Sequence, residues 1–474
     1  MRKKGYILIT ALIIGAAVFY FYTGRGSLRT TTGLYEYIRA GYDAIEKKEY
    51  PRGIKLLRKA YEVQPGDIAI QKNLLDGYIA YADALDKKDD LDGALKVIAA
   101  ASSIDPKDPD VVREAAYLSC QKGALLSGRK RLGESMEYYR KGVDLALSAD
   151  EARKDIAGYL YTLAQDAYAR DDRQTTLICL KSSYAIWERY ETLDFIAKVY
   201  YRQANPEAAK FYWERAQEID PAREGLDVNI KLAAGDSASQ RQALTVETEN
   251  FNIKLYKPYG TSVDTLEKML RKVYADVGGD LGYYPDRRTP VIFYSEADYR
   301  TIFRKPSEVR AFYDGSIRIP LRADVSSALF AATLAHEYAH AVVDILTEKG
   351  CPLWINEGIA GYEQAREAPV PVDVLRGVLP SGEAISIDRI EKGFASGATL
   401  NETLLSYQGA YAAICFMLDK WGWAGMRGLL KRIREGRHYA NAVDEEYLVS
   451  MPAFEEMLTQ YARAHYLVDK GGDK

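Results

Sequence analysis

Residues 33–232 carry a helical pattern of apolar and polar positions and contain no clear strands. Small residues recur at a fixed spacing, where two helices would have to touch, and a proline falls just past the second helix of each pair. In three segments these residues occupy relative positions 8, 20, 27 and 32: Gly41, Gly53, Ala60 and Pro65; Ala82, Ala94, Ala101 and Pro106; and Ala197, Ala209, Ala216 and Pro221. The pattern predicts a series of helical hairpins.

This spacing resembles the tetratricopeptide repeat, a helix–turn–helix of about 34 residues. Two weaker units between the clear ones have Gly123 with Gly142, and Ala164 with Ser183, at positions 8 and 27. The first two clear units are 41 residues apart, so extra residues must lengthen the helices or the loop near residues 86–90. Such hairpins stack into a superhelix with a concave side. The resemblance implies a groove for an extended peptide or a protein partner; a spacer is the alternative.

The N-terminal segment is apolar over the length of a membrane span. An uncharged run at residues 5–24 follows three basic residues at positions 2–4 and ends with aromatic residues at 19–22. As a helix it would span about 30 Å, the thickness of a bilayer core, with the aromatic residues at one interface. We expect residues 1–25 to be an uncleaved signal anchor, with the bulk of the chain extracytoplasmic (periplasmic or extracellular). A cleaved signal peptide is the alternative.

Beyond residue 232 the pattern changes. Residues 233–242 are rich in glycine, alanine, serine and aspartate, which predicts a linker. Residues 251–256 alternate and residues 290–294 form a short apolar run, so both predict strands. Residues 316–319 are predicted as an edge strand that can pair with an extended peptide. Because helical patterns dominate from there onward, residues 246–470 are expected to form an α+β domain.

The most specific signal is the pentapeptide HEYAH at residues 336–340, which holds two of the four histidines of the chain. The surrounding residues 326–346 contain no proline or glycine and are rich in alanine and leucine, which predicts a helix. Positions i and i+4 share one face of a helix. His336 and His340 can therefore close on one metal ion, with Glu337 beside the place of a water molecule.

Catalytic zinc normally has three protein ligands and one open position. Glu357 lies seventeen residues after His340, beyond a Lys-Gly-Cys-Pro segment at 349–352 that predicts a tight turn between antiparallel helices. His340 and Glu357 would then lie at comparable distances from the turn, so that their side chains come abreast. The same geometry disfavours Glu348, which lies at the turn, and Glu363, which lies nearly two turns further on.

The HExxH helix followed by Trp-x-Asn-Glu-Gly-x-Ala-x-Tyr at residues 354–362 resembles the gluzincin metallopeptidases. The similarity is greatest to the aminopeptidase N type and to bacterial membrane-associated peptidase-MA-like proteins. It implies a zincin fold for the C-terminal domain and one zinc ion. It also implies that His336, His340 and Glu357 are zinc ligands and that Glu337 is the general base.

Two supporting residues are expected around such a metal. Gluzincins carry a later tyrosine within a helix that ends at a glycine; here Tyr407 opens such a segment and Gly422 closes it fifteen residues on. The resemblance implies that Tyr407 donates to the oxyanion of the transition state, with Tyr411 as the alternative. Ligating histidines also donate their second nitrogen to a carboxylate or carbonyl, and Asp344, one turn after His340, is a candidate partner.

One part of the family pattern is absent. Aminopeptidase N-type enzymes have an upstream Gly-x-Met-Glu-Asn segment that grips the free amine of the substrate, and the corresponding residues 312–320 do not contain it. Both aminopeptidase and endopeptidase cleavage therefore stay open.

The composition argues against nucleic-acid binding and against a cysteine metal site. A net charge of -3 over 474 residues, without a basic, aromatic-rich patch, gives no case for nucleic-acid binding. The four cysteines, at positions 120, 179, 351 and 415, have no CxxC spacing and predict buried thiols rather than a metal knuckle, with disulfides as the alternative.

These patterns together predict a membrane-anchored zinc metallopeptidase. It would hydrolyse peptide bonds of a peptide or protein substrate, and its repeat array would recruit the substrate or a partner. The rival from another class is a non-catalytic scaffold, in which the repeats bind assembly partners and a zinc-binding, zincin-like domain serves for docking.

Overall fold

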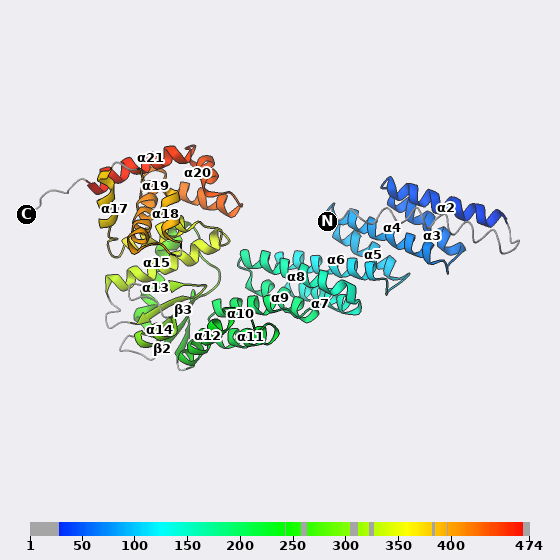
Figure 1. Cartoon of the computed structure of the whole chain (residues 1–474), viewed down its shortest axis with the longest axis horizontal. Helices are drawn as coiled ribbons and strands as arrows, with labels where there is room; N and C mark the ends of the chain where they lie inside the picture. The colour runs from blue at the N-terminus through cyan, green and yellow to red at the C-terminus, as the bar shows by residue number, and fades with distance from the viewer. Residues whose placement is uncertain are drawn as a thin grey trace, which may run out of the picture. The chain divides into compact units, whose positions relative to one another are not determined.

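The computed structural model describes residues 28–241, 243–256, 263–303, 311–321, 327–381, 384–395 and 397–467 (Figure 1). The expected signal anchor, residues 1–25, lies outside these ranges. Within them, no helix combines the length and the apolar character needed to cross a bilayer. The chain divides into two compact units, Met1–Leu160 with Ala185–Trp187 and Tyr161–Tyr184 with Glu188–Lys474.

Paired helices build the first unit. They are α2 (Leu28–Glu46), α3 (Tyr50–Val63), α4 (Ile68–Asp86), α5 (Leu91–Ser102), α6 (Pro109–Gly128), α7 (Leu132–Ser148) and the start of α8 (Asp150–Ala169). The small residues predicted at contacts between helices do lie at such contacts. A Cβ on Gly53 would stand 2.9 Å from the carbonyl oxygen of Gly41, and Ala82 and Ala94 are fully buried. Since α4 has 19 residues where α10 of the second unit has 13, the extra residues of the longer repeats lengthen the helices.

The second unit opens with the end of α8 and most of α9 (Arg173–Ile186), followed by α10 (Tyr190–Arg202), α11 (Pro206–Ile219) and α12 (Leu226–Gln240). The linker predicted at residues 233–242 is wrong, because α12 continues to Gln240. Ala233 and Asp236 are fully buried, and a Cβ on Gly235 would lie 3.4 Å from Ile302. The small side chains that suggested a linker instead allow α12 to pack closely on its neighbours.

A five-stranded mixed sheet follows, in the order β1-β2-β3-β5-β4. Its strands are β1 (Ala243–Glu247), β2 (Phe251–Tyr256), β3 (Thr289–Ser295), β4 (Phe312–Tyr313) and β5 (Ile317–Leu321). The strands β2, β3 and β5 run parallel, while β1 and β4 pair antiparallel with β2 and β5. The strands predicted at residues 251–256 and 290–294 are confirmed. The edge strand predicted at residues 316–319 is wrong, because β5 is an inner strand and the two-residue β4, too short to leave an alternating pattern, forms that edge.

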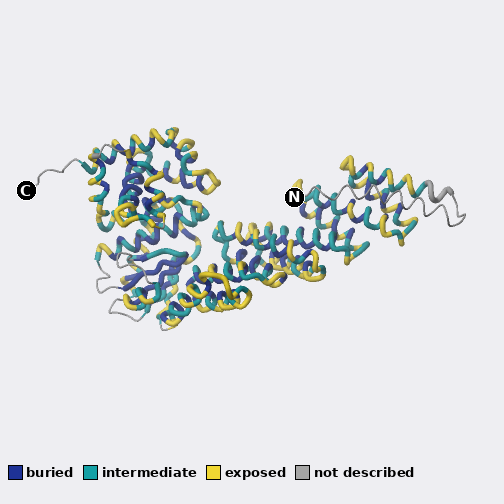
Figure 2. The backbone as a smooth tube through the Cα atoms, in the orientation of Figure 1, coloured by how far each residue is buried: buried dark blue, intermediate teal, exposed yellow. Residues whose placement is uncertain are grey.

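Helices cover both faces of the sheet (Figure 1). The helices that follow α12 in the chain are α13 (Val263–Leu281), α14 (Glu296–Phe303), α15 (Ala328–Leu346), α16 (Leu353–Ala365), α17 (Asp373–Val378), α18 (Ile387–Gly393), α19 (Leu400–Arg434), α20 (Tyr439–Tyr447) and α21 (Met451–Ala462), with a 3-10 turn at Leu379–Ser381 and a π-helical turn at Arg463–Leu467. On one face Val291 and Phe293 of β3 join the core formed with α13 and α15. On the other face Ile292 and Tyr294 pack with Tyr299 of α14. This two-sided cover explains why every residue of β3 is buried (Figure 2).

Candidate metal centre

The two histidines of the HEYAH segment lie on one face of α15. This helix begins after Ser327, whose side chain accepts a hydrogen bond from the N–H of Phe330 at 3.2 Å. The imidazole centroids of His336 and His340 are 4.8 Å apart. Their side chains are mostly buried, with 19% and 14% exposed. The sequence therefore places the two rings together, as the helical spacing predicts.

A tight turn returns the chain as α16. Glu348 and Lys349 take positive φ angles of 52° and 64°, and Pro352 immediately precedes the first residue of α16. From this helix the Oε2 atom of Glu357 lies 3.5 Å from Nε2 of His336 and 3.6 Å from Nε2 of His340. The three residues named as metal ligands from the sequence thus converge on one point.

The spacing of these atoms suits a metal ion better than hydrogen bonds. Nitrogen–oxygen hydrogen bonds measure about 2.7–3.2 Å, and the buried Oε2 atom of Glu357 has no hydrogen-bond partner among the described residues. Ligand atoms placed about 2.0–2.1 Å from a tetrahedral zinc ion would be roughly 3.3–3.4 Å apart. The candidate donor atoms of His336, His340 and Glu357 all lie within 4.8 Å of one another. The residues therefore fit a zinc ion.

Asn356 orients one of the imidazoles. Its Oδ1 atom lies 2.7 Å from Nδ1 of His340, a contact that favours a proton on Nδ1 and leaves the Nε2 lone pair toward Glu357. The expectation that Asp344 plays this part is wrong, because Asp344 pairs with Arg202 at 3.2 Å. In the sequence, the only hint of this contact is that Asn356 directly precedes Glu357. Consecutive side chains of a helix point in different directions, so this adjacency does not predict that Asn356 contacts His340.

Glu337 lies beside the ligand set rather than in it. Glu337 is only 6% exposed. Its carboxylate accepts a hydrogen bond from the backbone N–H of Tyr313 in β4. Burial raises the pKa of Glu337 to about 7, with the charge of Glu357 adding to the rise and His340 opposing it. For Glu357 burial also opposes ionisation, but the two imidazoles hold its pKa below the usual value. The two carboxyl groups therefore differ, one suited to exchanging a proton and the other to staying charged.

The helix α19, which carries Tyr407, packs against the ligand helix α16. A Cβ on Gly358, the residue after Glu357, would lie 2.5 Å from the carbonyl oxygen of Ala410, so glycine there allows α19 to approach α16. Burial raises the pKa of Tyr407, and the charges of Glu357 and Glu337 raise it further.

The alternative tyrosine faces elsewhere. Burial raises the pKa of Tyr411, and the neighbouring groups that raise it further are Cys415, Tyr362 and Asp419.

The glycine predicted to close the helical segment also has a structural counterpart, because Gly422 breaks α19 with φ of 64°. Of the two candidates for an oxyanion donor, Tyr407 is the one whose pKa is raised by the charges of Glu357 and Glu337.

The segment that carries these residues is similar to a known family. Residues 317–464 match the Peptidase MA superfamily. The matched segment, residues 317–464, contains the strand β5, the ligand helices α15 and α16, and α19. A tetratricopeptide repeat matches residues 190–223, which hold α10 and α11.

Two solved structures of tetratricopeptide-repeat proteins match this chain at low sequence identity. A thermophilic TPR protein of Thermus thermophilus is 15% identical with a TM-score of 0.20, over 42% of this chain and 98% of that chain. The TPR domain of P58(IPK) is 12% identical with a TM-score of 0.17, over 90% of this chain and 98% of that chain. The repeats are assigned from the sequence match and the observed helical hairpins. A search of curated proteins gave no match.

The two glutamates that the sequence disfavoured as ligands, Glu348 and Glu363, have other partners. Glu348 pairs with Arg434 at 3.0 Å. Glu363, which is 1% exposed, lies 3.5 Å from Arg366. Burial raises the pKa of Glu363 to about 8, and Asp280 adds to the rise while Arg366 opposes it.

Glu363→Gln should change the dependence of stability on pH. Between about pH 4.5 and 8 the folded protein keeps a proton on Glu363 that the unfolded chain has lost, so the wild type loses stability as the pH rises through this window. Glutamine has no proton to lose, so the variant should be more stable than wild type at pH 8.5, by up to a few kcal/mol at about 1.4 kcal/mol per pKa unit, and similar to it at pH 4.5. Urea unfolding at both pH values measures this.

A matched control for this experiment is Glu296→Gln, which removes an exposed pair with Arg300 and should cost less than about 1 kcal/mol at either pH. If Glu363→Gln changes stability equally at both pH values, the proton on Glu363 is not responsible.

Proposed function

We propose that this chain is a zinc metallopeptidase. The observation that carries the proposal is the convergence of His336, His340 and Glu357 on one point, with the buried Glu337 beside it. Zinc held by the three residues would polarise the scissile carbonyl and make a water molecule more acidic. A Peptidase MA superfamily match over residues 317–464 supports the same assignment.

Glu337 would act as the general base and then as the general acid. It takes a proton from the attacking water and passes it to the leaving amine. A pKa of about 7 suits both transfers at neutral pH. Because its carboxylate already accepts the N–H of Tyr313, its orientation is fixed before substrate arrives.

Tyr407 would stabilise the negative charge that develops on the carbonyl oxygen. Its raised pKa keeps the phenol protonated at neutral pH, so it can donate a hydrogen bond to the oxyanion. The residue is 40% exposed, so a bound substrate can reach it.

The rest of the chain would bring the site to its substrate. The tetratricopeptide repeats are proposed to recruit a protein partner or the substrate itself, as repeat arrays of this kind commonly do. The apolar segment at residues 5–24 supports a membrane anchor with an extracytoplasmic peptidase.

The function is tested by hydrolysis of a casein substrate by the purified full chain. Cleavage should stop after treatment with a zinc chelator and return when zinc is restored. If the protein binds zinc fully and neither treatment changes any cleavage, the scaffold hypothesis replaces this one.

Replacing Tyr407 with phenylalanine should lower kcat by about 10²–10³ and leave KM nearly unchanged, because a donor to the oxyanion acts only in the transition state. Steady-state kinetics on a fluorogenic peptide measure both constants. Tyr411→Phe is the matched control, since this phenol faces Cys415 and Asp419, and it should stay within about twofold of wild type. Equal losses in the two variants would contradict the role of Tyr407.

A further inference from the structure

We propose that the last tetratricopeptide repeat is part of the catalytic machinery. Arg202, the final residue of α10, is a positioning residue that holds the turn between β4 and β5 against α15 and thereby sets the place of Glu337. The proposal rests on the peptidase function proposed above, and goes beyond it by assigning a residue of the repeat array to the site.

The link between this turn and the general base is a backbone hydrogen bond. Tyr313 of β4 donates its N–H to the carboxylate of Glu337. The strand β4 pairs with β5 only through Phe312 with Arg318 and Tyr313 with Ile317, within the described residues. So short a strand gains little from its own ladder, so its position depends on the packing of Phe312 against Tyr299 and Phe303 and on the contacts of the turn that follows Tyr313.

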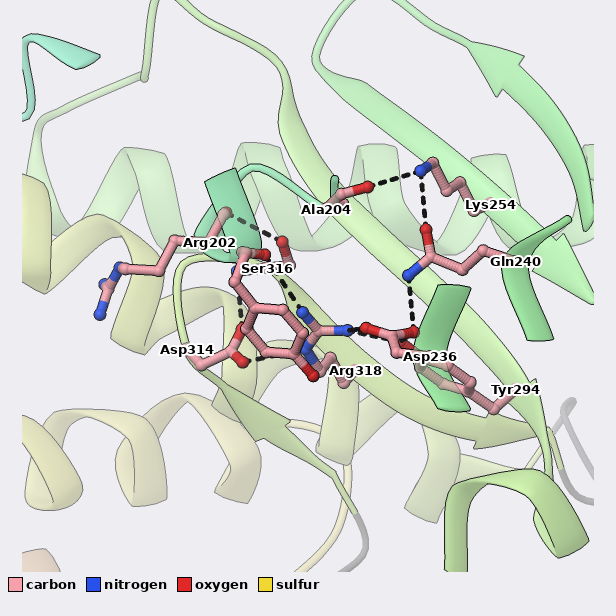
Figure 3. A network of polar contacts seen from close by, with 10 residues as sticks. Arg202, Ala204, Asp236, Gln240, Lys254, Tyr294, Asp314, Ser316 and Arg318 are labelled. Atoms are coloured by element: carbon pink, nitrogen blue, oxygen red, sulfur yellow. Dashed lines mark hydrogen bonds and ion pairs between the residues drawn. The ribbon is translucent and has the colours of Figure 1, made fainter. Parts of the chain in front are cut away.

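That turn, formed by Asp314, Gly315 and Ser316, packs against Arg202. The hydroxyl of Ser316 donates to the carbonyl oxygen of Arg202 at 3.0 Å (Figure 3). Gly315 has a φ of 105°, and a Cβ there would lie 2.6 Å from the Cβ of Arg202. The guanidinium of Arg202 also lies 5.8 Å from the ring centroid of Tyr313. One residue of the repeat therefore contacts the turn through its backbone, its stem and its charge.

The same guanidinium reaches the helix that carries the histidines. It pairs with Asp344 of α15, one turn after His340, at a distance of 3.2 Å. The two side chains are only 26% and 21% exposed, so solvent screens this pair less than a surface pair. Arg202 thus ties β4 to α15, and the hydrogen bond between Tyr313 and Glu337 needs those two elements at a fixed separation.

The sheet itself is anchored independently of Arg202. Arg318 of β5 is fully buried and reaches Asp236 of α12 at 2.7 Å, and it also holds Asp314 of the turn at 3.0 Å (Figure 3). It also donates to the carbonyl oxygen of Tyr201 at 3.3 Å. Loss of the Arg202 side chain should therefore loosen the turn and leave the sheet folded.

The test is Arg202→Met in the full chain, which keeps the apolar stem and removes the charge. It should lower kcat about tenfold to a hundredfold, the loss expected from a misplacement near 1 Å, with KM within about twofold and zinc content unchanged. Hydrogen exchange of the peptide covering residues 312–317 should become at least about tenfold faster. Arg202→Lys should recover part of both effects, because it keeps a cation beside Asp344.

Two further variants keep the test decisive. Arg215→Met removes a cation of α11 whose partner Glu218 is exposed, and it should change neither rate nor exchange. If Arg202→Met does not fold, Ser316→Ala removes one contact of the same turn and should raise the same exchange. The proposal is overturned if hydrogen exchange of residues 312–317 is unchanged in whichever of these two variants folds. It is also overturned if Arg202→Met lowers kcat because the protein has lost its zinc. A wild type that cleaves nothing refutes the peptidase function, while the exchange result still decides the positioning role.

Discussion

Replacing Glu337 with glutamine is expected to lower kcat for peptide hydrolysis by about 10²–10⁴ while zinc content stays at the wild-type level. Glutamine has almost the same shape and can still accept the N–H of Tyr313, but it cannot take a proton from water. Glu337 lies outside the convergent set of His336, His340 and Glu357, so metal binding should not depend on it. Initial rates on a fluorogenic peptide, beside elemental analysis of the same sample, measure both quantities.

Glu348→Gln provides the control for this variant. Glu348 is the glutamate of the turn between the two ligand helices and pairs with Arg434, so its loss should leave the rate within about twofold. A Glu337→Gln enzyme that works within tenfold of wild type would remove Glu337 from the mechanism. A variant that loses its zinc would make Glu337 a ligand instead.

The second large effect concerns stability. Asp236→Ala should lower the free energy of unfolding by about 3–5 kcal/mol, because it leaves the fully buried cation of Arg318 without its closest acid. Both side chains of this pair are 0% exposed and their atoms lie 2.7 Å apart. The double variant Asp236→Ala with Arg318→Met should lose less than the sum of the two single variants, since it buries no unpaired charge. Chemical unfolding followed by circular dichroism gives the values.

Asp227→Ala on the same helix is the matched control. Asp227 pairs with Lys231 at 3.5 Å, and both side chains are more than half exposed, so the change should cost less than about 1 kcal/mol. If Asp236→Ala costs no more than this control, the buried pair contributes nothing to holding α12 on the sheet.

The ligand helices could be predicted because their signals are local. His336 and His340 are one helical turn apart, the helix between residues 326 and 346 has no breaker, and the turn at residues 349–352 has helix-ending and helix-starting residues. Each of these signals depends on neighbours in the chain. The register of Glu357 against His340 followed from counting residues on either side of the turn.

The contacts that anchor the site could not be predicted in this way. Asp236 and Arg318 are 82 residues apart, and nothing local marks either one as a partner of the other. The small residues around Asp236 suggested a linker because glycine, alanine and serine are common both in loops and where helices pack closely. The choice of Asn356 over Asp344 as the partner of His340 depended on Arg202, which comes from a distant repeat.

The metal content of the purified full chain, measured by elemental analysis beside Glu357→Gln, tests the central claim most directly. We predict one zinc ion per wild-type chain and much less in the variant, because the third ligand would be gone while His336 and His340 remain. A wild type without stoichiometric metal, or a variant that binds zinc as well as wild type, would contradict the proposed site.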